Sequence, residues 1–217
     1  MRSYSQYCSV AKALDVVGDR WTLLIVRELL ARGQSRYTDL RAGLPGIATN
    51  LLADRLRELE TAGLLDRVAA PPPVATTVFQ LTPRGEALGG VIRELGQWGV
   101  PLMAEYRPDD SFRGQWLRLP VRTFLADHEP GQPAVSIQIR ADDQIVMIDV
   151  GAGEVSLRLE ADPHPDAVIA GSPPSVLALF SGHIPLSSAA ERGLEVTGST
   201  EAVARILPRR PYGGTTD

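Results

Sequence analysis

The fold of the first half is decided by TDLRAGLPGIATNLLADRLRELETAG, residues 38–63. Thr38 is a predicted N-cap for a short helix over residues 39–44, and Pro45 and Gly46 supply a turn. The next segment, residues 49–62, carries leucine at 52, 56 and 59, the i, i+4, i+7 spacing of one buried helical face. Gly63 suits the C-terminal end of that helix. Two helices joined by a tight turn are therefore predicted.

The residues before this pair predict two more helices. Apolar side chains recur with helical spacing between residues 10 and 17, and Gly18 ends that run. Asp19 is the predicted N-cap of the second helix, which carries an apolar face through Leu23, Val26 and Leu30 and ends at Gly33.

The residues after Gly63 change to an extended pattern. Residues 64–68 and 77–81 are predicted strands on either side of a proline-rich loop, residues 69–76. Thr82 and Pro83 then supply an N-cap and a first-turn proline for a helix with apolar residues at 88, 92, 95 and 98. The order of four helices, strand, loop, strand and helix is that of a winged helix-turn-helix, in which one helix enters the major groove of DNA.

Several spaced motifs resemble those of the HxlR-type transcriptional regulators. They are CSVAKALDVVGDRWTLLI (residues 8–25), RYTDL (36–40), LPGI (44–47), LRELE (56–60) and LTPRG (81–85), so the resemblance covers about residues 5–104. It implies a bacterial homodimer that binds double-stranded operator DNA and dimerises through the first and last helices of this domain.

The helix over residues 49–62 is the predicted reading helix, because its exposed face carries short polar and basic side chains. Asparagine suits adenine, and arginine suits guanine or phosphate. The predicted DNA-contacting residues are Arg36, Thr38, Thr49, Asn50, Ala53, Arg55, Arg57 and Arg67. An alternative for Arg55 and Arg57 is ion pairing with Asp54, Glu58 or Glu60 on the helix surface. The loop at 69–76 has no basic residue, so contact of the wing with the DNA backbone would rest on Arg67.

Cys8 is the only cysteine, so no intrachain disulfide can form. Some HxlR-type members sense oxidants or electrophiles through a cysteine at the matching position, and a thiolate beside Lys12 at the start of a helix would be reactive. We therefore consider Cys8 a possible redox sensor; the alternative is a small buried residue of the first helix.

Charge divides the 217-residue chain into two parts. Residues 1–104 carry a net charge of +2, and residues 105–217 carry −6. The longest uncharged apolar stretches are far shorter than the roughly 18 residues of a membrane span, and the N-terminus lacks the apolar core of a secretion signal, so we predict a cytoplasmic protein without membrane association.

The second half predicts a separate α+β domain. The polar, proline-broken segment 105–114 is the predicted linker, so the predicted domains are residues 1–104 and 115–217. A helix around residues 117–125 precedes three alternating segments, 135–139, 145–150 and 155–159, which predict an antiparallel sheet. A strand at 166–170, a helix that begins at Ser172-Pro173-Pro174 and ends at Gly182, a short helix at 188–192, a strand at 194–197 and a helix at 201–207 follow.

This order resembles a sterol-carrier-protein-type lipid-binding domain, together with FSG at residues 180–182, LEVTGS at 194–199 and EAV at 201–203. The resemblance implies an effector domain for fatty-acyl, sterol or other apolar ligands. Its predicted pocket residues are Phe124, Val135, Ile137, Ile139, Leu157, Leu159, Leu177 and Phe180. The alternative is that these side chains form an ordinary core.

No catalytic pattern is found. The sequence has no H-E-x-x-H, P-loop or G-x-S-x-G motif, and the DPHPD segment at 162–166 is better explained as a rigid loop than as a metal site. We predict no enzyme activity, cofactor or metal. The predicted function is a ligand-responsive transcriptional repressor. The rival prediction is a lipid-binding or carrier protein whose winged helix serves mainly for dimerisation.

Overall fold

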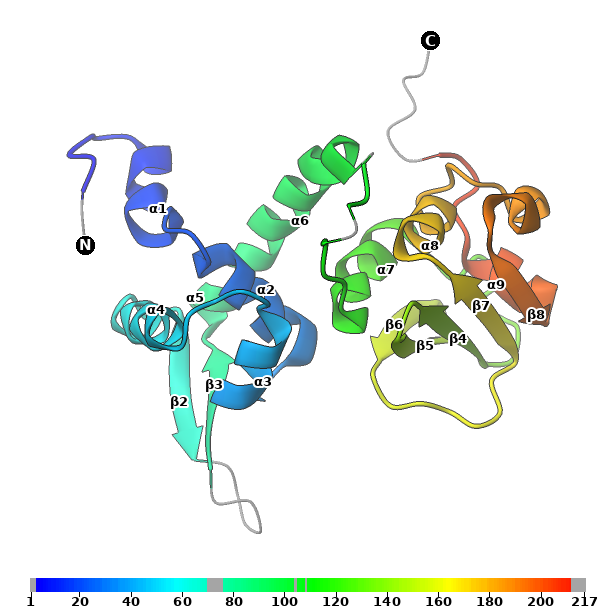
Figure 1. Cartoon of the computed structure of the whole chain (residues 1–217), viewed down its shortest axis with the longest axis horizontal. Helices are drawn as coiled ribbons and strands as arrows, with labels where there is room; N and C mark the ends of the chain where they lie inside the picture. The colour runs from blue at the N-terminus through cyan, green and yellow to red at the C-terminus, as the bar shows by residue number, and fades with distance from the viewer. Residues whose placement is uncertain (1–2, 70–75, 104, 108, 212–217) are drawn as a thin grey trace. The chain divides into compact units, whose positions relative to one another are not determined.

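The computed structural model describes residues 3–69, 76–103, 105–107 and 109–211, which form two compact units, Met1–Pro101 and Leu102–Asp217. Figure 1 labels the elements of both units. The fold class predicted from the sequence, a winged helix-turn-helix followed by an α+β domain, is confirmed.

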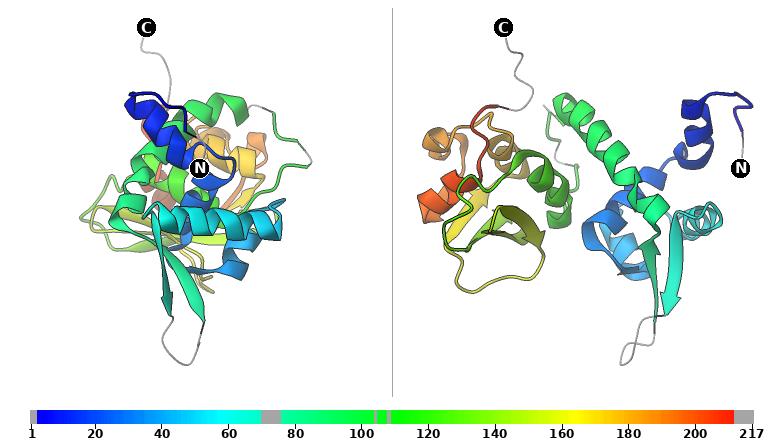
Figure 2. Two further views of the ribbon diagram at one scale, coloured as in Figure 1. Left: turned by 90° about the vertical axis from the view of Figure 1, so that its left-hand side faces the viewer. Right: turned by 180° about the vertical axis from the view of Figure 1, so that it is seen from behind.

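The N-terminal unit consists of helices around a small sheet. Its helices are α1 (Ser9–Val17), α2 (Thr22–Arg32), α3 (Tyr37–Gly43), α4 (Thr49–Thr61), α5 (Pro83–Glu86) and α6 (Leu88–Gly99), followed by a 3-10 turn (Val100–Met103). The strands β1 (Ser35–Arg36), β2 (Leu65–Ala69) and β3 (Thr77–Leu81) form an antiparallel sheet in the order β1-β3-β2. The β2–β3 hairpin extends away from the helices (Figure 2).

The core of this unit forms where the predicted leucine stripe packs. Leu52, Leu56 and Leu59 of α4 are at most 2% exposed, and Ile25 and Leu40 are completely buried. Burial of these side chains holds α4, which contacts β2, in the core of the unit, because apolar area removed from water stabilises the packed arrangement by about 25 cal/mol per Å². The opposite side of α4 is left to solvent.

Two predicted helix caps, Asp19 for α2 and Thr38 for α3, are wrong. Helix α2 begins at Thr22 with Trp21 as its N-cap, because residues 19–22 form a turn in which the Thr22 N–H donates to the Asp19 carbonyl at 3.2 Å. Helix α3 begins at Tyr37, one residue before the cap predicted at Thr38, and the Arg36 N–H at its start donates to the Asp39 carboxylate at 3.0 Å. The predicted cap at Thr82 is present. Ser172, whose role as a cap was not predicted, accepts a hydrogen bond from the Ser175 N–H at the start of α8.

The C-terminal unit is a five-stranded sheet with helices on one face. A 3-10 turn (Gly114–Leu117) and α7 (Arg118–Phe124) precede strands β4 (Val135–Ala141), β5 (Gln144–Gly151), β6 (Glu154–Arg158) and β7 (Ala167–Gly171). Helix α8 (Pro173–Phe180), two 3-10 turns (Leu186–Ser188 and Ala190–Arg192), β8 (Glu195–Gly198) and α9 (Thr200–Ile206) complete it. The helices pack on the face formed by Ile137, Ile148 and Ile169.

The sheet is mixed, which corrects the purely antiparallel sheet expected from the sequence. Its order is β6-β5-β4-β7-β8, and β7 runs parallel to β4, with Ile139 opposite Ile169. Residues 159–166 therefore cross from one end of the sheet to the other before β7 begins. This crossing buries Gln138 and Met147, which lie on the sheet face away from the helices.

Candidate functional site

Two features fix α4 relative to α3: a hydrogen bond between the first residues of the two helices, and a buried leucine in the turn that connects them. Tyr37, the first residue of α3, donates a hydrogen bond from its hydroxyl to the Thr49 carbonyl at 2.6 Å. Leu44 in the turn is 1% exposed and anchors it in the core. The first turn of α4 is therefore fixed relative to α3 by both a hydrogen bond and apolar packing.

The predicted reading residues lie together at the N-terminal end of α4. Thr49 and Asn50 are exposed, and Ala53 on the next turn is half-buried. Thr38 and Arg36, at the start of α3, are exposed as well. The structure thus presents short polar side chains on a rigid helix end, which is the geometry that direct contact with base edges requires.

The other predicted cationic residues are engaged in ion pairs. An Arg55 Nη atom lies 2.6 Å from the Asp19 carboxylate and also contacts Glu58. Arg57 pairs with Asp54 on the same helix. The pairs of Arg55 with Glu58 and of Arg57 with Asp54 are those that the sequence offered as an alternative to DNA contact, whereas the pair of Arg55 with Asp19 was not predicted.

Arg67 on β2 is placed differently from the arginines of α4. Its Nε lies 2.9 Å from Glu60, and its guanidinium carbon lies 5.4 Å from the centre of the Phe79 ring. Most of the predicted wing loop, residues 70–75, lies outside the described residues.

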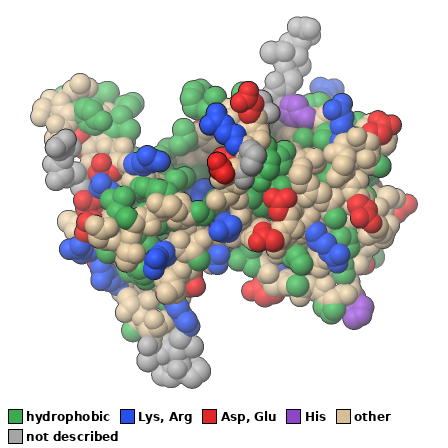
Figure 3. Space-filling view, viewed as in Figure 1, with side chains coloured by type: hydrophobic (Ala, Val, Ile, Leu, Met, Phe, Trp, Pro, Cys, Tyr) green, Lys and Arg blue, Asp and Glu red, His purple; other side chains and the backbone are tan. Residues whose placement is uncertain are grey.

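The first and last helices of the unit leave large apolar side chains in solvent. Such side chains lie at the surface over α1 and on α6 (Figure 3). The exposed apolar residues of these segments are Tyr4, Tyr7, Val10 and Leu14, and Val91, Leu95 and Trp98. A surface of this kind on a pair of helices is typical of a protein–protein interface.

Cys8 is exposed and immediately precedes α1. Hydrogen bonds from the backbone N–H groups of Ala11 and Val10 lower the pKa of its thiol, because they stabilise the thiolate. The lysine expected beside the thiol, Lys12, instead pairs with Asp15 at 3.8 Å. The backbone of the helix start, rather than a lysine, therefore favours the thiolate.

The predicted ligand-pocket residues divide into two groups. Ile137, Ile139, Leu157 and Phe180 are at most 5% exposed and belong to the packed core between the sheet and the helices. Phe124, Val135, Leu159 and Leu177 are only partly buried and pack against the edge of that core.

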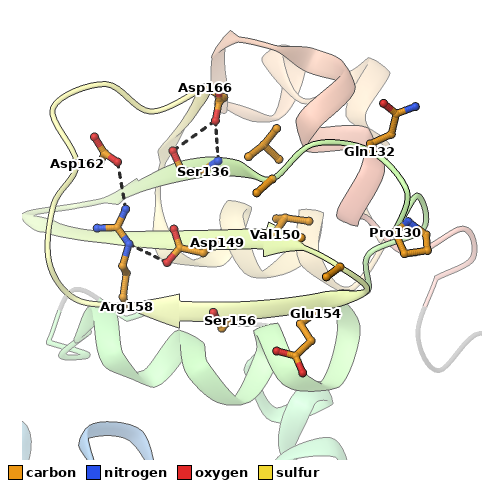
Figure 4. Close-up of a pocket in the computed structure, with 14 residues that line it drawn as sticks. Pro130, Gln132, Ser136, Asp149, Val150, Glu154, Ser156, Arg158, Asp162 and Asp166 are labelled. Carbon is orange, nitrogen blue, oxygen red and sulfur yellow. Dashed lines mark hydrogen bonds and ion pairs between the residues drawn. The ribbon is translucent and has the colours of Figure 1, made fainter.

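A hollow of about 720 Å³ lies elsewhere, on the sheet face away from the helices. Figure 4 shows Arg158 between Asp149 of the neighbouring strand and Asp162 of the crossing segment, with Nε–O and Nη–O distances of 2.7 and 3.2 Å. Asp166 accepts a hydrogen bond from the Ser136 N–H at 2.7 Å. Hydrogen bonds from the His164 N–H and Arg158 lower the pKa of Asp162. Val135 is the only member of the predicted pocket set among the residues that line this hollow.

Sequence reasoning missed two residues that contact α4, Tyr37 and Asp19. Asp19 was assigned to a helix cap, and its actual partner, Arg55, is 36 residues away. A local pattern gives no signal for a pair so far apart in the chain. Tyr37, by contrast, was visible in the sequence as the aromatic residue before the predicted cap Thr38. Among the described residues, no group of three or more histidine, cysteine, aspartate or glutamate side chains is arranged to hold a metal ion.

Residues 16–106 match the family model described as HxlR-like helix-turn-helix. The uncharacterized HTH-type transcriptional regulator YvaP of Bacillus subtilis is 36% identical over 89 residues, which cover 41% of this chain and 82% of YvaP. The uncharacterized HTH-type transcriptional regulator YtfH of Escherichia coli is 33% identical over 95 residues, covering 44% of this chain and 75% of YtfH. The reduced form of the transcriptional regulator YodB from B. subtilis matches with a TM-score of 0.40 and 28% identity, covering 47% of this chain and all of YodB. In the described part of the chain, no helix is both long and apolar enough to span a membrane.

Proposed function

The chain belongs to the HxlR-like helix-turn-helix family of transcriptional regulators, and from that premise we propose that it is a homodimeric repressor whose α4 reads operator DNA. We further propose that an apolar small molecule, bound by the C-terminal unit, modulates this binding. The observation that carries the proposal is the exposed, polar first turn of α4, held rigidly by the Tyr37–Thr49 hydrogen bond.

The chemistry of α4 supports contact with both bases and phosphates. Asn50 has the donor and acceptor pair that matches the major-groove edge of adenine. Arg57 is 66% exposed and Asp54 is 51% exposed, so their pair is worth only about 0.2–1 kcal/mol and can be exchanged for a guanine or a phosphate. Arg36 and Thr38 at the start of α3 would contact the DNA backbone beside it, and Arg67 on β2 would contact the backbone next to the wing.

Dimerisation through α1 and α6 is supported by their exposed apolar side chains. Trp98 is 71% exposed and Val10 is 66% exposed. Burying several such residues against a second copy would remove enough apolar area from water to offset the entropy lost on association. Two reading helices would then face half-sites about one helical turn of DNA apart.

Ligand binding by the C-terminal unit is supported by the half-buried apolar residues at the edge of its core. Phe124 on α7 and Leu177 on α8 belong to helices that contact each other, and both residues pack against the core without being enclosed by it. An apolar molecule would enter beside these two residues and separate the helices from the sheet. The bound molecule would favour a dimer geometry in which the reading helices no longer match the two half-sites.

Cys8 offers a second input to the same regulator. Its exposure and the lowered pKa of its thiol favour reaction with oxidants. We expect treatment with diamide to weaken operator binding by the wild type and to leave a Cys8→Ser variant unaffected. Unchanged binding by the treated wild type would exclude this role.

The proposal is tested by fluorescence anisotropy with DNA from the region upstream of the gene and with a scrambled duplex, at two salt concentrations. We expect saturable binding that prefers the upstream duplex and is lost in an Asn50→Ala, Arg57→Ala double variant. Addition of fatty acids or sterols, with native mass spectrometry of the protein, then tests the ligand. Absence of any bound lipid and of any thermal shift would exclude the apolar effector.

One observation favours a second candidate function, a lipid carrier whose winged helix serves only for dimerisation. Arg55, Arg57 and Arg67 are all engaged in ion pairs within the chain, which leaves fewer cations for phosphates. This candidate predicts lipid binding with no preference for the upstream duplex at either salt concentration, so the same experiment separates the two functions.

A further inference from the structure

Helix α1 is linked to the rest of the N-terminal unit by four residues, Gly18–Trp21, which we call the α1–α2 connector. Trp21 in this connector has φ of +81°, the left-handed region that bulky side chains seldom adopt. Such a conformation persists only where the surroundings hold it in place. The connector is therefore a constrained segment.

Two contacts hold the connector against the helix-turn-helix. The indole of Trp21 lies next to the α3–α4 turn, because a Cβ placed on Gly46 would be 3.9 Å from its Cη2. The Asp19 carboxylate accepts a hydrogen bond from Arg55 of α4 at 2.6 Å. The connector is thus in direct contact with both the α3–α4 turn and α4.

The side chain of Arg55 is much less exposed to solvent than that of Arg57. The Arg55 side chain is 18% exposed, against 66% for Arg57, and the Nε of Arg55 is buried without a hydrogen-bond partner in the described part of the chain. The Arg55 guanidinium also contacts Glu58 on its own helix. This enclosure suits a link between two elements better than a side chain that reaches toward DNA.

We propose that Asp19 and Arg55 are positioning residues, which hold the connector, and through it α1, in the orientation in which α4 binds the operator. This inference rests on the proposed function, because it takes α4 as the reading helix. It changes the role expected for Arg55 from a phosphate contact to a link between the dimerisation helix and the reading helix.

Electrostatics and positioning predict opposite signs for the loss of the Asp19 charge. Removing a carboxylate beside α4 reduces repulsion of the phosphates, so simple electrostatics predicts tighter DNA binding by Asp19→Asn. Loss of a positioning contact predicts weaker binding. Arg55 is largely buried while Asp19 is 60% exposed, so we expect the upper end of the range for surface ion pairs, an approximately five-fold change in affinity.

The test compares operator affinities of full-length variants by fluorescence anisotropy, with dimer dissociation constants and Tm measured in parallel. We expect Asp19→Asn to weaken operator binding about five-fold and Asp19→Glu to restore it to within about two-fold of the wild type. Asp54→Asn is the matched control, because it removes a carboxylate that pairs only within α4. We expect this control to leave affinity unchanged or slightly stronger.

Arg55→Gln supplies a second, independent measurement. If Arg55 bound a phosphate, its loss would reduce the slope of log affinity against log salt by about 0.9. Positioning predicts weaker binding with an unchanged slope, and an Asp19→Asn, Arg55→Gln double variant no weaker than Arg55→Gln alone.

The inference is overturned if Asp19→Asn binds the operator as well as or better than the wild type, if Asp54→Asn weakens binding equally, or if Arg55→Gln lowers the salt slope. These outcomes all leave wild-type binding intact. Failure of the wild type itself to prefer the upstream duplex would instead overturn the proposed function.

Discussion

The two units of this chain differ in how many of their large apolar side chains are exposed to solvent. In the N-terminal unit, α1 and α6 expose large apolar side chains such as Val10, Leu95 and Trp98. In the C-terminal unit, the residues from the 3-10 turn at Gly114 onward bury theirs in a single core, and Ile145 is the exposed exception among those described.

The difference indicates which unit would gain by burying apolar surface against a partner. An exposed apolar helix pair is unfavourable in water, and a second copy of the chain would relieve that cost. The C-terminal unit covers its own apolar sheet face with α7, α8 and α9. The N-terminal unit therefore offers an apolar surface to a partner, whereas the C-terminal unit buries its large apolar side chains within its own core.

The largest expected effect is on the core of the C-terminal unit. Phe180 is completely buried, and Phe180→Ala should lower the free energy of unfolding of this unit by about 3–5 kcal/mol. Urea unfolding followed by Trp116 fluorescence, in a Trp21→Phe, Trp98→Phe background, measures it. Ile145→Ala is the control, with an expected change of at most about 0.5 kcal/mol. A loss below about 1 kcal/mol for Phe180→Ala would contradict tight packing of Phe180 in this core.

The next effect concerns the exposed helices of the N-terminal unit. Leu95→Asp should weaken the dimer by about 100-fold, because it replaces about 1.5–3 kcal/mol of apolar burial with a buried charge. Sedimentation equilibrium gives the dimer dissociation constant. Ile145→Asp, an equivalent change at an exposed apolar residue of the other unit, should leave it unchanged. Equal effects of the two substitutions would contradict dimerisation through α6.

A smaller effect is expected at the reading end of α4. Asn50→Ala should reduce operator affinity by about 1–3 kcal/mol, since it removes a pair of hydrogen bonds to one base. Anisotropy with the wild-type operator measures the loss. Thr61→Ala, at the opposite end of the same helix, is the control and should bind normally. If both variants lose affinity together, the N-terminal turn of α4 does not read the operator.

The smallest expected effect is the change with pH in the free energy of unfolding of the C-terminal unit. Hydrogen bonds from Arg205, together with those from the Glu129 and Gly153 N–H groups, lower the pKa of Asp127 from its ordinary value of 3.8. Because the folded-state pKa lies below the unfolded one, the stabilisation is complete above about pH 4 and is lost as the pH falls further. Urea midpoints between pH 3 and pH 7 measure it. Asp127→Asn should flatten this dependence, and a variant that keeps the full slope would assign it to other carboxyl groups.

Much of the fold could be predicted because local patterns specify it. The leucine spacing in α4, the Thr82 cap, the prolines at the start of α8 and the alternation along β4, β5 and β6 each depend on neighbouring residues, and the elements form near their predicted positions. The exposure of Asn50 could be predicted in the same way, since it lies on the face of α4 opposite the leucine stripe.

Other features depend on residues far apart in the chain and could not be predicted. The parallel β4–β7 pair joins segments separated by a crossing connection, and nothing in the local alternation of β7 indicates its direction. The Asp19–Arg55 and Asp127–Arg205 pairs span 36 and 78 residues. These ion pairs form only when packing of the unit brings the two side chains close together.

Hydrophobic period and capping act over a few residues, so the local pattern specified the α3–α4 helix pair, the strands of the wing and the presence of a second α+β unit. The tertiary structure alone decided which arginines are held in ion pairs, that the predicted pocket residues form a packed core and its edge, and that the apolar faces of α1 and α6 remain uncovered. Ion pairing and burial depend on the distance between side chains in space, and that distance is set by packing of the whole unit.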